Sequence, residues 1–171
     1  MLPSSCRAHC RALLLPILLG GCGGDRDPQN PNPPEQSKAD LSAGPIEAPA
    51  ALRLDSLLEM RVGVRNGGGR TAGPGWVVRV FLSADVAVDP SDTQIDQFVT
   101  TRELPSGGDD RYLRHKKLDR NIAPGRYYIG SMLDVTAAVP ETNEANNTLD
   151  SPSTIILTPG STLDATRRTQ P

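Results

Sequence analysis

The sequence predicts an all-β fold, an antiparallel β-sandwich of about seven short strands. Three features predict it: apolar and polar residues alternate with a period of two, turns rich in Gly, Pro and Asp separate the alternating segments, and no segment shows a helical period. The 171 residues are enough for one domain with length left over for tails. We expect the sandwich domain at residues 51–158 and a flexible C-terminal tail at residues 159–171.

The N-terminal segment 1–21 is typical of a secretory signal peptide. It carries Arg7 and Arg11 but no acidic residue, and the apolar run 12–19 follows. A run of this length is too short to span a bilayer as a helix, which takes about 20 residues. A basic start, a short apolar middle and small residues before a break indicate a segment that is removed on export.

The segment ends on Leu19-Gly-Gly-Cys22, which resembles the bacterial lipobox. The resemblance implies that Cys22 becomes the first residue of the mature protein and carries fatty acyl chains such as palmitate. Each CH₂ of such a chain contributes about 0.8 kcal/mol when it is buried in a membrane. Because residue 23 is Gly rather than Asp, the resemblance also implies an outer-membrane lipoprotein of the cell envelope, at the periplasmic face or the surface. The alternative is an ordinary signal peptide in which Cys22 has no special role.

Cysteine usage and net charge indicate which disulfides and which classes of partner the mature chain can have. Cys6 and Cys10 lie in the removed segment, so the mature chain keeps only Cys22 and forms no internal disulfide. Loss of Arg7 and Arg11 makes an already acidic chain more acidic. This balance argues against nucleic acid as a partner, because proteins that bind it concentrate positive charge on one face.

Residues 22–50 predict a Pro-rich, disordered tether behind the lipidated cysteine. Prolines remove backbone donors and favour extended geometry, and the segment has almost nothing apolar to bury. The prolines lie at positions 28, 31, 33, 34, 45 and 49.

The strands follow the tether in order. Apolar residues alternate with polar residues over 58–64, and a second apolar row runs over 76–82. The basic segment Arg111–Arg120 is expected to be an edge strand, because charged edges discourage pairing between sheets. Its alternative role is contact with anionic lipid or polysaccharide. The remaining strands are expected at residues 93–99, 127–133 and 154–157.

A folded part of about 100 residues has the usual size of an immunoglobulin-like sandwich. Tyr127 follows a Pro-Gly turn and opens the penultimate strand, as the tyrosine of a tyrosine corner does in such folds. We expect its hydroxyl to hydrogen-bond back to the preceding turn, since a buried phenol needs a partner. The alternative is that Tyr127 or Tyr128 only fills the strand.

Four segments together resemble the CARDB domain, the bacterial "cell adhesion related" module, over about Leu54–Thr158. They are Val62-Gly-Val-Arg-Asn-Gly-Gly68, Val80-Phe-Leu-Ser-Ala-Asp85, Pro124-Gly-Arg-Tyr-Tyr-Ile129, and the set Asp134, Val139, Glu141, Glu144, Asn146 and Asn147. The resemblance implies an immunoglobulin-like domain of surface or secreted proteins that serves adhesion or interaction and shares no catalytic residue. The chain departs from the family in its basic segment 111–120 and in carrying a single copy.

The polar residues of the last segment allow two interpretations. Short polar side chains satisfy the backbone groups of a long loop, which is the role we expect for Asp134, Glu141, Asn143, Glu144, Asn146 and Asn147. The alternative is a ligand-binding loop.

Candidate chemistry is sparse elsewhere. Asp85, Asp89 and Asp92 gather oxygen donors in one turn, which makes them weak candidates for calcium, but aspartates are also common in turns for their own backbone hydrogen bonds. His115 is the single histidine of the mature chain and stands among arginines and lysines, where we expect a solvated residue rather than a general base or zinc ligand.

The function expected from these features is non-catalytic. We expect a cell-envelope lipoprotein, held at a membrane by its N-terminal lipid, that presents a binding or adhesion module to an unknown protein or polysaccharide. The alternative is an accessory subunit that tethers or assists a secreted hydrolase. No cofactor is expected apart from the weak calcium candidate.

Overall fold

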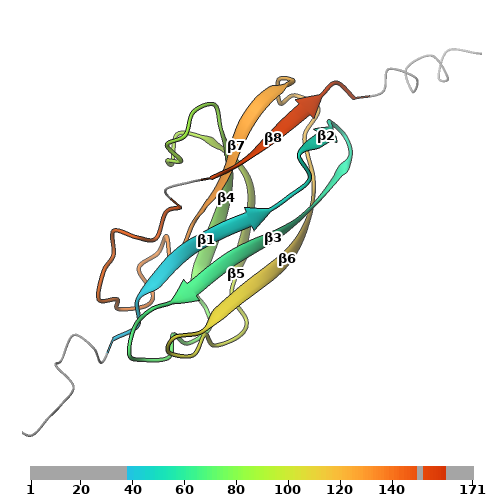
Figure 1. The fold of residues 1–171 in the computed structure, drawn as a ribbon. Helices are drawn as coiled ribbons and strands as arrows, with labels where there is room; N and C mark the ends of the chain where they lie inside the picture. Colours follow the sequence, from blue (N-terminus) through green and yellow to red (C-terminus); the bar gives the residue numbers. More distant parts are fainter. Residues whose placement is uncertain (1–37, 150–151, 161–171) are drawn as a thin grey trace, which may run out of the picture. The chain divides into compact units, whose positions relative to one another are not determined.

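The computed structural model describes residues 38–149 and 152–160, which form two β-sheets that pack face to face (Figure 1). The predicted signal peptide, Cys22 and residues 161–171 of the predicted tail lie outside the described residues. The strands are β1 Leu41–Glu47, β2 Ala51–Arg53, β3 Leu57–Asn66, β4 Val77–Ser83, β5 Thr93–Val99, β6 Asp109–Lys117, β7 Gly125–Met132 and β8 Ser153–Thr158.

The strand order confirms the predicted antiparallel sandwich. One sheet has three strands in the order β1-β3-β6, and the other has five in the order β2-β8-β7-β4-β5. Every pairing is antiparallel except that of β2 with β8. The described residues contain eight strands where about seven were predicted. Among residues 38–149 and 152–160, no helix is long and apolar enough to cross a membrane.

The two predicted apolar rows supply the centre of the core. The inward positions of β3 are all buried, and so are Trp76 and the inward positions of β4. The outward Phe81 is buried as well, because the loop between β4 and β5 folds back over that face of the five-stranded sheet. The alternation with a period of two therefore places the inward residues of β3 and β4 on the two facing sides of the core.

The predicted tether over residues 22–50 is wrong from residue 38 onward. β1 lies in this range, and its Leu41 and Ile46 are almost completely buried. Its alternation is hard to recognise because the register shifts between Ala43 and Ile46, where Pro45 stands in a bulge. Proline has no N–H to donate, and an edge strand tolerates it because no neighbouring strand on the outer side needs that donor. The folded domain therefore begins at residue 38 rather than 51.

The N-terminal strands close one side of the sandwich. β1 pairs with β3 in one sheet, and β2 then pairs with β8 in the other, so the chain crosses between the sheets (Figure 1). On the other side, β5 and β6 are the edge strands, which confirms the predicted edge position of the basic segment. The chain also crosses between the sheets on this second side, from β5 to β6 through residues 100–108, and we call this side, where β5 and β6 are the two sheet edges, the open side of the sandwich.

Candidate functional site

The loop between β7 and β8 holds the most specific sequence motif, and its carboxylates bond to backbone. Asp134 is buried and has a positive φ of 41°. Its two oxygens accept hydrogen bonds from the N–H groups of Ala138 at 2.9 Å and Val139 at 2.7 Å. Asp134 therefore organises the first turn of the loop.

Glu141 links this loop to β1 from a buried position. Its side chain is 4 % exposed, and it accepts hydrogen bonds from the Leu41 N–H at 2.8 Å and from Asn147 Nδ2 at 3.3 Å. Burial raises the pKa of Glu141 to about 7, and the nearby carboxylates of Glu144 and Asp134 act in the same direction. The two hydrogen bonds oppose that rise because they favour the charged form.

The same loop covers the free edge of β1. Ala39 forms a parallel bridge with Glu141, and the Ala43 N–H donates to the Asn146 carbonyl at 3.3 Å. The Asn146 side chain adds a bond from Nδ2 to Asp40 Oδ1 at 3.0 Å. The loop therefore takes the place of a further strand beside β1.

Four of the six motif residues, Asp134, Glu141, Asn143 and Glu144, accept from backbone with their side chains, whereas the side-chain amides of Asn146 and Asn147 bond carboxylates instead. Glu144 Oε1 accepts from the Glu141 N–H at 3.1 Å, and Asn143 Oδ1 accepts from the Ala145 N–H at 3.0 Å. The backbone carbonyl of Asn147 accepts from the Leu133 N–H at 2.8 Å. Two buried amide oxygens, Oδ1 of Asn146 and of Asn147, have no donor among the described residues.

Asn66 is a structural residue whose role the sequence reasoning missed. Its side chain is completely buried and makes four hydrogen bonds. Oδ1 accepts from the N–H groups of Asp40 and Gly68, and Nδ2 donates to the carbonyls of Arg70 and Leu104. The signal for it was the segment Val62-Gly-Val-Arg-Asn-Gly-Gly68, from which we predicted a resemblance to the CARDB domain but no role for Asn66 itself.

Tyr127 has the geometry predicted for a tyrosine corner. Its hydroxyl donates to the Ala123 carbonyl at 2.9 Å, four residues upstream. The ring packs against the core from a partly buried position. The predicted bond back to the preceding turn is therefore confirmed.

The three calcium candidates are engaged within their own turn. Asp85 Oδ1 accepts from the Ala87 N–H, and Asp92 Oδ2 accepts from the Asp89 N–H. Asp89 Oδ1 accepts from both the N–H and the hydroxyl of Ser91, and these bonds lower the pKa of Asp89. Within residues 38–149 and 152–160, no group of three or more His, Cys, Asp or Glu side chains is arranged to hold a metal.

The basic segment 111–120 is largely paired with carboxylates. Arg111 pairs with Glu47, while Arg114 reaches the buried Asp96 at 2.8 Å. His115 is half exposed, with Nε2 at 3.2 Å from Glu59 Oε2. The remaining pairs are Lys116 with Asp96 at 4.0 Å, Lys117 with Asp55 at 3.7 Å and Arg120 with Asp55 at 3.4 Å.

A groove of about 750 Å³ lies beside the end of this segment, near the open side of the sandwich. Residues 116–123 of β6 and its following loop form one wall, and residues 93–95 of β5 form another. Lys117 and Arg120 on its wall already share Asp55 as a partner. The groove therefore offers little unpaired charge to a ligand.

The comparisons with known proteins bear on the fold. No family model matches the sequence, and no curated protein matches it. Solved structures of CARDB domains do match. A Pyrococcus furiosus CARDB domain, described as a complex with di-metal ions, is 21% identical with a TM-score of 0.52, and covers 71% of this chain and 90% of its own.

Two solution structures agree with that match. One, again of the Pyrococcus furiosus CARDB domain, is 23% identical with a TM-score of 0.51, and covers 71% of this chain and 96% of its own. The other is a domain of a Methanosarcina acetivorans protein described as a cell surface protein. It is 21% identical with a TM-score of 0.53, and covers 71% of this chain and 93% of its own. At these identities the similarity shows the fold, which is the immunoglobulin-like all-β fold that the motifs predicted.

Proposed function

We propose that this chain, whose fold is that of CARDB domains, is a non-catalytic lipoprotein of the cell envelope that presents a binding or adhesion module. The fold indicates an adhesion-related module. The lipobox-like segment ending in Cys22 supports the anchor, and the absence of Asp after it supports an outer-membrane location.

One observation carries the proposal of a binding scaffold. The polar residues of the CARDB-like motifs bond to the protein's own backbone, from Asn66 through Asp134 to Glu141. Groups used in this way hold loops and strands in place, and their polar atoms are already engaged by the protein's own backbone rather than free for proton transfer or nucleophilic attack. The module therefore acts through the faces that this framework displays.

Mass spectrometry of the protein from its native cells tests the anchor. We expect a mature chain that begins at Cys22 with acyl chains attached, and a Cys22→Ser variant that leaves the membrane fraction. An intact N-terminus, or a serine variant that stays in the membrane, contradicts the anchor.

Affinity capture from envelope extracts tests the binding role. We expect an envelope partner to bind the anchored protein, and no turnover when the protein is assayed against a panel of hydrolase substrates. Stoichiometric capture of one secreted hydrolase supports the accessory role instead.

Calcium is the remaining cofactor question. The Pyrococcus furiosus domain is described with di-metal ions, but here Asp85, Asp89 and Asp92 bond to their own turn. We expect millimolar calcium to leave Tm within about 1 °C of its value in chelator, because a site occupied only in the folded state raises Tm. A rise of several degrees that Asp89→Asn abolishes contradicts this expectation.

A further inference from the structure

Ion pairing divides the cations of the described domain into two groups. The cations of β6 and its following loop pair with Glu47, Asp55 or Asp96, so their charge is largely compensated locally. By contrast, five cations are not ion-paired with any residue of 38–149 or 152–160: Lys38, Arg53, Arg70, Arg79 and Arg126. Of these, Arg53, Arg79 and Arg126 lie on strands of the five-stranded sheet.

The strand register places two of these arginines on one outward face. Arg126 of β7 lies opposite Ile156 of β8, which lies opposite Ala51 of β2. Tyr128 is opposite Thr154 in the next outward row, and Arg53 is opposite Thr158. No acidic residue occupies an outward position in these three strands. We call Arg53, Arg126, Tyr128, Thr154 and Ile156 the cationic patch.

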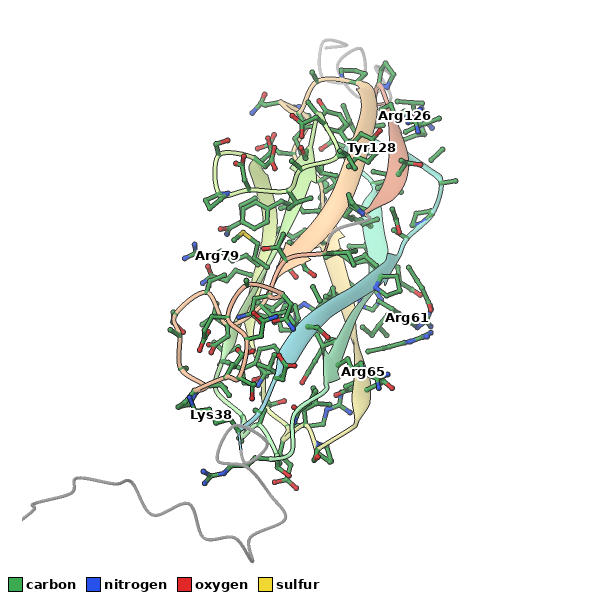
Figure 2. The ribbon with its side chains drawn as sticks, turned by 60° about the vertical axis from the view of Figure 1, so that its left-hand side comes forward. Lys38, Arg61, Arg65, Arg79, Arg126 and Tyr128 are labelled. Atoms are coloured by element: carbon green, nitrogen blue, oxygen red, sulfur yellow. The ribbon has the colours of Figure 1, made fainter. Side chains whose placement is uncertain are left out.

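Four residues of the patch are exposed and Tyr128 is half-buried, whereas the neighbouring part of the same face is covered. A Cβ on Gly130 would lie 2.6 Å from Val88 Cγ2, so the loop after β4 packs on that part of β7. Beyond this contact, Ile156 is 51 % exposed. Figure 2 shows Arg126 and Tyr128 beside each other towards one end of β7, with the guanidinium 5.8 Å from the ring centroid.

We propose that the cationic patch binds a linear polysaccharide that carries carboxylates, such as a polyuronate. An arginine guanidinium matches a carboxylate with two parallel hydrogen bonds, and neither Arg53 nor Arg126 has a carboxylate partner among the described residues. Tyr128 and Ile156 offer apolar surface against which a sugar ring can pack. This inference rests on the proposed binding role and gives that role a face and a ligand class.

The size and chemistry of the patch favour this ligand over a folded protein. A stable protein interface takes about 20–30 residues on each side, far more than the five residues of the patch. A linear polyanion needs only a short row of contacts, and the unpaired positive charge supplies its attraction. Acidic peptides and anionic lipid surfaces share that charge but lack sugar rings, so they serve as competing outcomes of the test.

Calorimetric titration of the full chain in detergent with short oligogalacturonates tests the proposal. We expect binding that weakens as salt rises and that falls about tenfold in Arg126→Gln, which corresponds to about 1.4 kcal/mol. Tyr128→Ala should weaken oligogalacturonate binding as well. The matched control is Arg61→Gln with Arg65→Gln, two exposed arginines of the opposite sheet (Figure 2), and it should bind like the unmodified protein.

Several results would overturn the proposal. They are no binding, an equal loss in the Arg61/Arg65 control, equal affinity for neutral malto-oligosaccharides, and tighter binding of poly-glutamate or of vesicles containing phosphatidylglycerol. Circular dichroism of each variant confirms that the sandwich is intact. Because lipidation at Cys22 and capture of an envelope partner are measured separately, loss of oligogalacturonate binding leaves the proposed function testable on its own.

Discussion

At the scale of single residues, the side-chain amide of Asn66 uses both of its donor hydrogens and accepts two further bonds. It connects the end of β3 to the backbone of Asp40 before β1 and to Leu104 before β6. A residue without this amide removes a partner from the part-buried backbone groups of Asp40, Gly68 and Arg70, and each lost hydrogen bond costs free energy. Gly68 stands in the same turn because a Cβ there would lie 2.4 Å from the Lys38 carbonyl oxygen.

We therefore expect Asn66→Ala to lower the free energy of unfolding by about 2–4 kcal/mol. Chemical denaturation followed by tryptophan fluorescence measures the change, since Trp76 is completely buried. Asn121→Ala, at an exposed position, serves as the control and should change stability by less than about 0.5 kcal/mol. Equal effects of the two substitutions would refute the structural role of Asn66.

Glu141 should make stability depend on pH. Because its folded-state pKa of about 7 lies above the ordinary value of 4.5, the folded chain keeps a proton that the unfolded chain has lost between these values. The stabilisation from this group is complete below pH 4.5 and decreases as the pH rises to 7, by about 1–3 kcal/mol.

The variant Glu141→Gln isolates this dependence. Its Nε2 can donate to the unpartnered Oδ1 of Asn147 once that amide rotates, while its Oε1 accepts from Leu41. We expect the variant to gain stability relative to the unmodified chain as the pH rises from 4.5 to 7. Parallel curves of stability against pH for Glu141→Gln and the unmodified chain would contradict the raised pKa of Glu141.

At the scale of elements, an ion pair joins the edge strands β5 and β6 on the open side of the sandwich. Asp96 points inward from β5 and is 6 % exposed, and Arg114 of β6 reaches it at 2.8 Å. The Arg114 guanidinium also lies 4.5 Å from the centre of the Phe98 ring. An inward charge and a bulge in the pairing of β4 with β5 both discourage another strand from adding to the β5 edge.

A double-mutant cycle on Asp96→Ala and Arg114→Ala should give a coupling energy of about 1–2 kcal/mol, because the carboxylate is buried. The exposed pair Arg65–Asp109, at 3.7 Å, is the matched control and should give less than about 0.5 kcal/mol. Similar coupling in both pairs would show that burial of Asp96 adds nothing to the contact between β5 and β6.

The loop between β7 and β8 shows which features of an element can be predicted from sequence and which cannot. Its role in satisfying backbone was predictable, because short polar side chains in a long loop have that use. Its partner was not predictable, since β1 was assigned to the tether and lies about 100 residues earlier in the chain. Only the folded chain brings Leu41 to Glu141, and no local pattern records such a distant pairing.

For the whole molecule, the position at which the domain begins has a measurable consequence. A chain that starts at residue 38 keeps β1, with Leu41 and Ile46 in the core, and should unfold cooperatively. A chain that starts at residue 51 loses both side chains, and Glu141 loses its bond from the Leu41 N–H. We expect it to lose at least about 4 kcal/mol or to remain unfolded. Equal thermal unfolding of the two chains would show that the folded domain begins at residue 51 after all.

The sequence by itself determined the two apolar rows, the edge position of the basic segment and the tyrosine corner at Tyr127. Each of these depends on residues that are neighbours along the chain or alternate within one strand, and local periodicity records them. The tertiary structure alone decided that residues 41–47 form a strand and that Glu141 is buried beneath them. It also decided that the β6 cations are paired, while Arg53 and Arg126 have no ion pair within the part of the chain that the structure describes. These features depend on which distant segments meet, and that is set by packing of the whole core rather than by any local pattern.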